Sequence, residues 1–252
     1  MPAEAIRSAV PDPCPRCGDT GWTLVEIEGV QRAARCDCFV ERRRQRLIQK
    51  AGFPRRYLHC SFDKFNTKWQ AGSPDLNLQK ALQLSRDFVG DYPDVKAGLM
   101  YLGPCGVGKT HLAIATGRAL ILDKGAEVRF YDFRDLLREI QDSYNPESTS
   151  SELRILQPVI DCEVLILDEL GAKKPTEWVK DTVTHLLTNR YNERRITIIT
   201  SNYVDQPPQP AAEKLEDRIG TRLRSRLYEM CRDVVIDAKD YRQNILNPGY
   251  HR

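Results

Sequence analysis

Short apolar runs alternate with longer amphipathic stretches from Gly98 to about residue 201. The short runs predict four buried strands, with the sequences GLMYL, VRFYDF, EVLILDE and RITIITSN. The longer stretches predict a helix from about Lys109 to Asp123, then FRDLLREIQDSY, a short helix after the polar loop NPESTSS, and PTEWVKDTVTHLLTNRYNE. Strands that alternate with helices in this way predict an α/β fold with a doubly wound parallel sheet.

The chain before the first of these strands has a different pattern. Residues 1–40 contain little that resembles a core, and the strongly basic sequence ERRRQRLIQKAGFPRRY follows. A helix is predicted over about 40–51, because Gly52 and Pro54 would end it. A second helix is predicted over residues 76–89, LNLQKALQLSRDFV, where apolar residues recur at helical spacing.

Composition narrows the class of protein. At 252 residues the chain can form one sizeable core with a small appendage. Its apolar and charged fractions are ordinary for a soluble protein, and its net charge is only +3, so a nucleic-acid site would have to be a local patch. The N-terminal sequence has no apolar stretch long enough for a signal peptide, and the longest apolar runs are far shorter than a membrane span. These features predict a cytoplasmic protein with no membrane partner.

The sequence GPCGVGKT matches the phosphate-loop pattern G-x-x-x-x-G-K-[ST] and lies between a predicted strand and a predicted helix. Its glycines would let backbone N–H groups surround the phosphates of a nucleotide. Lys109 would contact the β- and γ-phosphates, and Thr110 would bind Mg²⁺. Cys105 is expected to contribute its backbone rather than its thiol. The residues predicted to bind ATP in this stretch are Gly103, Pro104, Cys105, Gly106, Val107, Gly108, Lys109, Thr110 and His111.

Acidic and polar residues follow two of the predicted strands. VLILDE places Asp168 and Glu169 at the carboxyl end of a buried strand, where ligands of α/β sheets bind. Asp168 would hold Mg²⁺, and Glu169 would activate a water molecule against the γ-phosphate. A nucleotide kinase does not need this adjacent glutamate, so the pair favours ATP hydrolysis. Asn202, at the end of the next strand, could hydrogen-bond the γ-phosphate or the attacking water, or be a simple turn residue.

The sequence LEDRIGTRLRSRLYEM is rich in arginine. If it is helical, Arg222 and Arg226 share a face and Arg224 points away from them. One interpretation is a solvated basic helix. The other is that one arginine reaches the γ-phosphate of a neighbouring subunit, where such a residue greatly accelerates hydrolysis.

The order GPCGVGKTHLAIA, VLILDELG, TIITSN, GTRLRSRL and DYR resembles the AAA+ helicase loaders of the DnaC/DnaI type and their relatives, the IstB-type transposition helper ATPases. The resemblance covers about residues 50–245. It implies that Asn202 is sensor 1, that Arg222 is an arginine finger acting on a neighbouring subunit, and that Arg242 is the sensor 2 arginine. The chain leaves no room for a full helical lid after DYR, so the core itself would have to place Arg242.

This resemblance implies an ATP-dependent DNA replication helicase loader. Such a protein binds the replicative helicase and single-stranded DNA, and it hydrolyses ATP so that the loader is released. The alternative is a transposition helper that binds target DNA and activates a transposase. A third hypothesis is a zinc-ribbon binding protein whose ATPase serves only as a conformational switch. The N-terminal cysteines favour the loader, because transposition helpers more often begin with a helical DNA-binding region.

Four of the eight cysteines, Cys14, Cys17, Cys36 and Cys38, lie in CPRC and CDC near the N-terminus. Two thiol pairs at this spacing predict a tetrahedral Zn²⁺ site, which would stabilise a segment that lacks a core. A small β-hairpin is expected between the pairs. Free cysteines in a flexible arm are the alternative. Some loaders of the family carry a similar module that docks on the helicase, although zinc ribbons also bind DNA.

The sequence thus predicts three regions: a zinc-binding module over 1–40, a basic linker helix over 41–56 and an AAA+ ATPase domain over 57–252. The basic segment could contact DNA phosphates or an acidic partner, or could be a solvated helix. Tyr57, Phe62 and Phe65 follow it and are expected to pack at the edge of the domain or to line the adenine pocket, rather than to stack on DNA bases. The remaining cysteines Cys60, Cys162 and Cys231 are interpreted as ordinary thiols.

Overall fold

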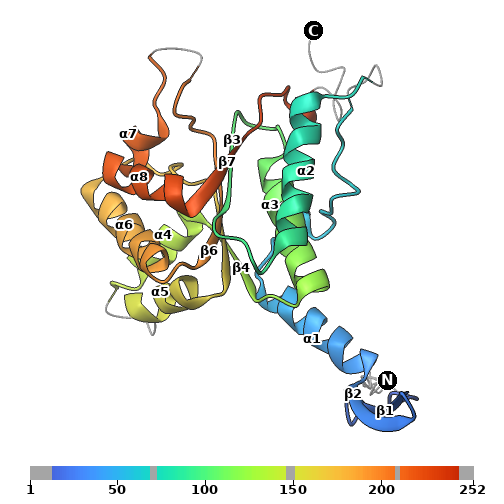
Figure 1. Cartoon of the computed structure of the whole chain (residues 1–252). Coiled ribbons are helices and arrows are strands. Elements are labelled where there is room, and N and C mark those ends of the chain that lie inside the picture. The colour runs from blue at the N-terminus through green and yellow to red at the C-terminus, as the bar shows by residue number, and fades with distance from the viewer. Residues whose placement is uncertain (1–12, 69–72, 146–150, 208–210, 244–252) are drawn as a thin grey trace, which may run out of the picture. The chain divides into compact units, whose positions relative to one another are not determined.

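The computed structural model describes residues 13–68, 73–145, 151–207 and 211–243 (Figure 1). The chain divides into two compact units, residues 1–46 and 47–252. Helix α1 (Asp37–Lys50) begins in the first unit and ends in the second. It starts a few residues before the predicted position.

The first unit contains the predicted hairpin. Strands β1 (Trp22–Ile27) and β2 (Val30–Arg35) pair antiparallel, with Trp22 opposite Arg35. Glu28 and Gly29 connect them with φ values of 52° and 77°. Two residues with positive φ form the type of turn whose twist matches that of the flanking strands. The hairpin therefore reverses the direction of the chain between the first cysteine pair and the second.

The second unit is built on a parallel sheet of five strands in the order β4-β5-β6-β3-β7. Because all strands are parallel, their carboxyl ends meet at one edge of the sheet, where ligands of such folds bind. The sequence predicted the first four strands and missed β7. The bounds are β3 (Gly98–Leu102), β4 (Val128–Asp132), β5 (Val164–Asp168), β6 (Ile196–Ser201) and β7 (Cys231–Val235).

Helices cover both faces of this sheet (Figure 1). Helices α2 (Leu76–Asp91) and α3 (Lys109–Ala119) pack on one face, and α3 continues as a single π-helical turn over Leu120–Lys124. The other face is covered by α4 (Phe133–Asp142), α5 (Glu152–Asp161), α6 (Glu177–Asn192), α7 (Leu215–Ile219) and α8 (Thr221–Met230). A short 3₁₀ turn, Arg55–Tyr57, precedes α2.

Alternating side chains of the strands fill two separate cores. In β3, Leu99 and Tyr101 pack toward α2 and α3, whereas Met100 and Leu102 pack toward the helices of the other face. Every residue of β3 and β5 is buried, which explains why these strands appear in the sequence as unbroken apolar runs. The α/β prediction is confirmed. In the described part of the chain, no helix combines the length and apolar character required to cross a lipid bilayer.

Candidate active site

The phosphate loop lies between β3 and α3, at the carboxyl edge of the sheet. Gly106 and Gly108 have φ values of 78° and 93°, which side chains rarely adopt. A Cβ on Gly108 would lie 2.6 Å from the ring of Phe65, and one on Gly106 would lie 2.0 Å from the Asp240 carboxylate. Helix α3 begins directly afterwards at Lys109, so its unpaired N-terminal amides can bind an anion.

A cavity of about 490 Å³ adjoins this loop. Its walls come from four parts of the second unit: the segment before α2, the phosphate loop with the start of α3, the residues after β5 and β6, and the segment after β7. The predicted residues Cys105 to His111, Glu169, Asn202 and Arg242 all line it. The fold therefore brings together most of the site that the sequence predicted.

Lys109 is 93% buried at the bottom of the loop, since only 7% of its surface is exposed. Its Nζ donates to the carbonyl oxygens of Gly103 at 2.8 Å and Pro104 at 2.6 Å. Burial lowers the pKa of Lys109 to about 8, although nearby carboxylates oppose the shift. A phosphate group is a stronger acceptor for an ammonium group than two carbonyls, so this position suits binding of a nucleotide's phosphates.

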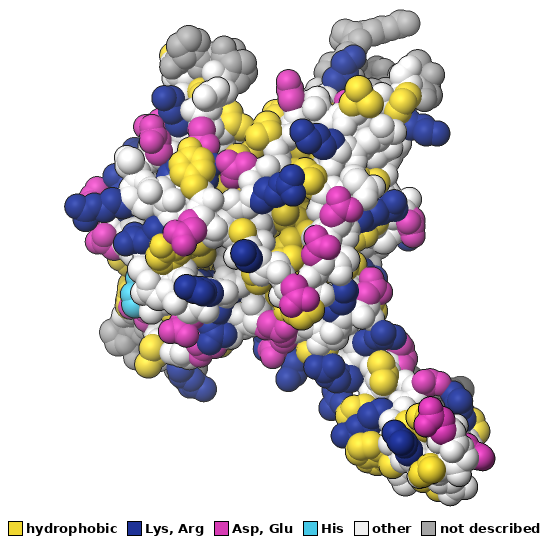
Figure 2. All heavy atoms as spheres, in the orientation of Figure 1, with side chains coloured by type: hydrophobic (Ala, Val, Ile, Leu, Met, Phe, Trp, Pro, Cys, Tyr) yellow, Lys and Arg dark blue, Asp and Glu magenta, His cyan; other side chains and the backbone are white. Residues whose placement is uncertain are grey.

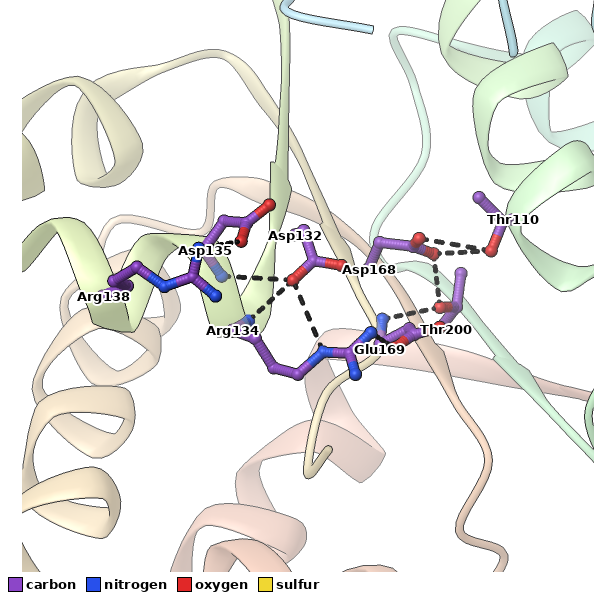
Figure 3. Close-up of polar contacts among 8 residues, drawn as sticks. All are labelled: Thr110, Asp132, Arg134, Asp135, Arg138, Asp168, Glu169 and Thr200. Carbon is purple, nitrogen blue, oxygen red and sulfur yellow. Dashed lines mark hydrogen bonds and ion pairs between the residues drawn. The ribbon is translucent and has the colours of Figure 1, made fainter. Parts of the chain in front are cut away.

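Asp168 at the end of β5 is buried and hydrogen-bonded by two hydroxyls (Figure 3). Thr110 Oγ1 donates to its Oδ1 at 2.9 Å, and Thr200 Oγ1 donates to the same oxygen at 2.6 Å. Burial raises the pKa of Asp168 to about 6, and the two hydroxyls partly oppose this. A hydroxyl beside a carboxylate provides the oxygen ligands that Mg²⁺ prefers, so Thr110 and Asp168 fit the predicted magnesium site.

Glu169 follows with φ of 58°, in the left-handed region that costs a residue with a side chain about 1 kcal/mol or more. Its N–H donates to Thr200 Oγ1 at 2.9 Å, and its carbonyl oxygen accepts from the N–H of Ala172 at 3.0 Å. The carboxylate lines the nucleotide cavity and forms an ion pair with Arg134.

Thr200 and Arg134 were missed by the sequence analysis, which singled out Asn202 after β6. Asn202 is exposed and lines the cavity, but the residue that contacts both acidic residues is Thr200. Its position at the carboxyl end of a predicted strand was the available signal. Nothing in the sequence indicated Arg134.

The segment after β7 is attached to the phosphate loop. The N–H of Tyr241 donates to the carbonyl oxygen of Gly106 at 3.0 Å, and the N–H of Arg242 donates to Asp240 Oδ1 at 2.8 Å. Arg242 lines the nucleotide cavity, and its charge contributes to the lowered pKa of Lys109. The core therefore places Arg242 near the phosphate loop through these backbone contacts.

The three arginines of α8 have different surroundings. Arg224 is only 2% exposed and donates to Asp205 and to Asp233, each at 2.6 Å. Arg222 is exposed and lies outside the nucleotide cavity of its own subunit, lining with Arg226 a separate cavity of about 380 Å³ beside α6. Arg222 and Arg226 thus share a face, and Arg224 points elsewhere, as the spacing predicted. The buried ion pairs make Arg224 unavailable to a neighbouring subunit.

Aromatic residues line part of the same cavity. Tyr57, His59 and Phe65 line it, and the Phe65 ring lies 5.4 Å from the ring of His111. His111 Nε2 is 2.9 Å from the carbonyl oxygen of Ser61. Flat rings that line the same cavity as the phosphate loop fit the predicted adenine pocket. Phe62 does not line the cavity and instead packs against the core.

The four N-terminal cysteines converge in the first unit. Their sulfur atoms all lie within 4.8 Å of one another, with 3.9 Å between Cys14 and Cys36 and 3.4 Å between Cys17 and Cys38. A tetrahedral zinc ion with bonds of about 2.3 Å separates its sulfur ligands by about 3.8 Å. The cluster therefore fits the predicted Zn²⁺ site. Among the other cysteines, Cys60, Cys162 and Cys231 are buried and Cys105 is exposed.

Comparison with known proteins agrees with this geometry. Residues 23–246 match the family of IstB-like ATP binding proteins. The chain is 25% identical to the phage-like element PBSX protein XkdC of Bacillus subtilis, over 94% of this chain and 86% of that protein. It is 23% identical to the replicative helicase loader DnaC of Escherichia coli K12, over 92% of this chain and 90% of the loader.

A crystal structure of the DnaC helicase loader superposes with a TM-score of 0.63 and 30% identity, and it covers 73% of this chain and 100% of that one. The family match, over residues 23–246, extends over most of the chain. This chain belongs to the IstB-like ATP binding protein family and is an AAA+ P-loop ATPase of the DnaC type.

Proposed function

We propose that the protein loads a replicative DNA helicase onto single-stranded DNA in an ATP-dependent manner. The observation that carries this proposal is the extent of the similarity to a protein named replicative helicase loader, which spans 92% of this chain. A similarity confined to the ATPase unit would support ATP hydrolysis alone. The similarity here reaches beyond residues 47–252, because that unit makes up less than 92% of the chain.

The surface of the hairpin supports a protein partner for the first unit. Its apolar side chains are exposed, with exposed fractions of 47% for Trp22, 69% for Leu24, 47% for Ile27 and 55% for Val30, and apolar groups are visible on this module in Figure 2. Because side chains alternate along a strand, Trp22 and Leu24 lie on one face of the hairpin, and Ile27 with its partner Val30 lies on the other. Exposed apolar side chains favour a protein partner, whereas DNA backbones are bound by cations and hydrogen-bond donors. In the proposal, the face with Trp22 and Leu24 docks on the helicase.

Hydrolysis would use the residues of the nucleotide cavity. The loop amides and Lys109 would bind and orient the phosphates of ATP. Thr110 and Asp168 would hold Mg²⁺, which would neutralise charge on those phosphates. Glu169 takes a proton from the attacking water, while Asn202 and Arg242 orient the γ-phosphate. Arg222 lies outside this cavity, so in the proposal it acts on the site of a neighbouring subunit. ATP binding favours assembly on DNA, and hydrolysis releases the loader.

The proposal is tested by mixing the full chain with the replicative helicase of its own organism in the presence of ATP and measuring the mass of the complex by light scattering. The expected result is a stable complex that Leu24→Asp weakens at least tenfold. Glu26→Gln, on the same strand, is the matched control and leaves the complex intact.

Two other outcomes of this experiment would contradict the proposal that the protein is a helicase loader. Absence of a complex, together with ATPase activity that DNA stimulates, would favour the transposition helper. Absence of a complex with slow turnover that DNA does not affect would favour a zinc-ribbon protein that uses ATP only as a switch.

A further inference from the structure

A cavity of about 600 Å³ lies at the edge of the sheet opposite the nucleotide cavity. It adjoins the amino ends of β3, β6 and β7. Its walls come from the segment before β3, from the last turn of α6 with the residues that lead into β6, and from the end of α8. This cavity and the nucleotide cavity share no lining residue in the described part of the chain. It is therefore a separate place on the same unit.

Positive charge predominates in this cavity. Its lining contains one carboxylate and four cationic side chains, which are Glu229 and Lys96, Arg190, Arg194 and Arg195. The excess of three positive charges equals the net charge of the whole chain. The Glu229 carboxylate already accepts a hydrogen bond from the Tyr191 hydroxyl at 2.8 Å. A hollow lined mainly by charge of one sign concentrates the electric field, so this cavity attracts anions.

Two of the arginines are held by the protein itself. Arg190 is fully buried, and its guanidinium donates to the carbonyl oxygens of Ile160 and Cys162, each at 2.9 Å. No carboxylate of the described residues forms an ion pair with it, so its positive charge adds to the field of the cavity. Arg195 pairs with Asp161 at 3.6 Å, but its Nε–H is buried and has no acceptor among the described residues.

The other two cations, Lys96 and Arg194, are exposed. Within the described chain, neither side chain forms a hydrogen bond or an ion pair with another residue. They are far apart in the sequence, but one precedes β3 and the other precedes β6, and these strands are neighbours in the sheet. The fold thus brings two unpaired cations to the mouth of one cavity, where both can reach a ligand.

Arg194 also has an unusual backbone conformation. Its φ is 50°, and it directly follows Glu193, the C-cap residue of α6. Glycine or asparagine is usual at this position after a helix, because a larger side chain is disfavoured there. The turn is held by its backbone, since the N–H of Arg194 donates to the carbonyl oxygen of Tyr191 at 3.0 Å. An arginine at a position that favours glycine indicates a role for its side chain outside the fold.

The lining favours a nucleic-acid strand over a free phosphate ion. Free phosphate groups are typically held by a cradle of backbone N–H groups, as in the phosphate loop. Cationic side chains from separate segments are instead typical of surfaces that bind the phosphodiesters of a polynucleotide. The partly exposed ring of Tyr191 lines the same cavity, and aromatic rings beside cations stack on the unpaired bases of single strands.

We propose that this cavity binds the backbone of single-stranded DNA, with Lys96 and Arg194 contacting phosphates and Tyr191 contacting a base. The inference rests on the proposed function, which requires a DNA strand, and adds the place where that strand binds. DNA and ATP then occupy opposite edges of the sheet and use different residues.

The test is fluorescence anisotropy of a labelled oligothymidylate with the full chain, Mg²⁺ and a non-hydrolysable ATP analogue at several salt concentrations. Arg194→Gly and Lys96→Gln should each weaken binding about three- to tenfold and reduce the salt slope by about one, as expected for one lost phosphate contact. Arg194→Lys retains the cation and should stay close to the parent affinity. Arg138→Ala, which removes a 70% exposed arginine of α4, is the matched control and should have little effect.

Thermal unfolding separates DNA binding from a structural role of Arg194. Because glycine favours the φ of this position, Arg194→Gly should be at least as stable as the parent chain while it binds DNA more weakly. Unchanged DNA affinity in both cavity variants, or an equal loss in Arg138→Ala, would overturn the inference.

Two further outcomes would also overturn it. If inorganic phosphate at constant ionic strength displaced the DNA from the parent chain, and Arg194→Gly abolished this effect, the cavity would be a site for free phosphate. If the parent chain bound no single-stranded DNA, this inference and the DNA step of the proposed function would both fail. The helicase complex is measured without DNA, so its formation would still be tested independently.

Discussion

In the unit of residues 47–252, two layers of buried side chains lie against the sheet, whereas the N-terminal hairpin buries almost none of its own. Among described residues 13–46, Cys36 is the one apolar side chain that is buried. The large unit can obtain its stability from apolar burial. The small one has too little apolar burial for this, so we expect a metal ion held by the four sulfur atoms to supply its order.

Because of this difference, we expect the two regions to tolerate different amino-acid substitutions. The side chains proposed to act in hydrolysis lie at the ends of buried strands, so we expect polar substitutions there to change ATPase activity while the two cores remain. The exposed apolar residues of the hairpin can change without loss of a core, whereas we expect the loss of any of the four cysteines to disrupt its fold. We therefore expect removal of the metal ion to unfold the N-terminal hairpin. We expect removal of single side chains at the nucleotide cavity to change ATPase activity without unfolding the large unit.

Loss of a cysteine should have the largest effect. We expect one zinc per chain and, with Cys36→Ser, loss of that zinc and of slow amide exchange over residues 22–35. Structural zinc contributes about 10–16 kcal/mol to the folding of small modules, so no apolar contact in the hairpin could replace it. The measurements are elemental analysis and hydrogen exchange on the full chain.

The same sample should retain ATPase activity, since the nucleotide cavity is lined only by residues of the large unit. Cys105→Ser, at an exposed cysteine outside the cluster, is the control and should keep its zinc. Zinc content that survives in Cys36→Ser would contradict the site. If Cys36→Ser also unfolded the large unit, the stability of that unit would depend on the cysteines and not on its own apolar burial.

Within the large unit, two arginines on α8 should separate stability from activity. Arg224→Ala leaves Asp205 and Asp233 partly buried without their cation, so we expect a loss of about 3 kcal/mol in the free energy of unfolding, measured by urea denaturation. Arg222→Ala removes an exposed side chain and should change stability by less than about 0.5 kcal/mol. Its effect should appear in ATPase activity instead.

Mixing variants tests whether Arg222 acts on a neighbour. Arg222→Ala retains a complete cavity, and Glu169→Gln retains the arginine, so each alone should be slow while an equimolar mixture recovers part of the activity. Recovery needs a site made from both chains. If the mixture is as slow as either variant, Arg222 does not act in trans. If Arg224→Ala proves as stable as the parent chain, the buried ion pairs contribute less than their burial implies.

The sequence predicted those parts of the site that are local. The phosphate loop is a continuous motif, and Asp168 and Glu169 follow an unbroken apolar strand, so neither depends on knowing the strand order. Strand β7 was missed because it lies at the edge of the sheet, where Arg232 is exposed and interrupts the apolar pattern. Arg134 could not be found, because its partner becomes a neighbour only when β4 lies next to β5.

Thr200 is an intermediate case. Its strand was predicted, but the sequence does not show which polar residue near the end of that strand faces Asp168. The spacing on α8 likewise predicted that Arg224 points away from Arg222. It did not predict the partners Asp205 and Asp233, which come from a loop and from β7. The local sequence pattern thus predicts which way a side chain points, whereas its contact partners are determined by the tertiary fold.

Two threonines on β6 provide the most selective test, and it is the one with the smallest expected effect. Thr200 is 1% exposed and holds both Asp168 and the Glu169 backbone. Thr197 is also fully buried, but it lies near the other end of the strand, where its hydroxyl accepts from Arg190 Nε at 3.0 Å. Replacing either by valine keeps the shape and removes one buried hydroxyl, so we expect each to lose about 1–3 kcal/mol of stability.

Only Thr200→Val should also reduce kcat, by about tenfold or more, because a displaced acidic side chain weakens transition-state stabilisation that depends on geometry. Thr200→Ser restores the hydroxyl and should recover most of the rate, measured at a temperature where all variants are folded. Equal losses of kcat in Thr197→Val and Thr200→Val would mean that the rate follows general stability. The acidic residues at the end of β5 would then owe their positions to the strand itself and not to the hydroxyl beside them.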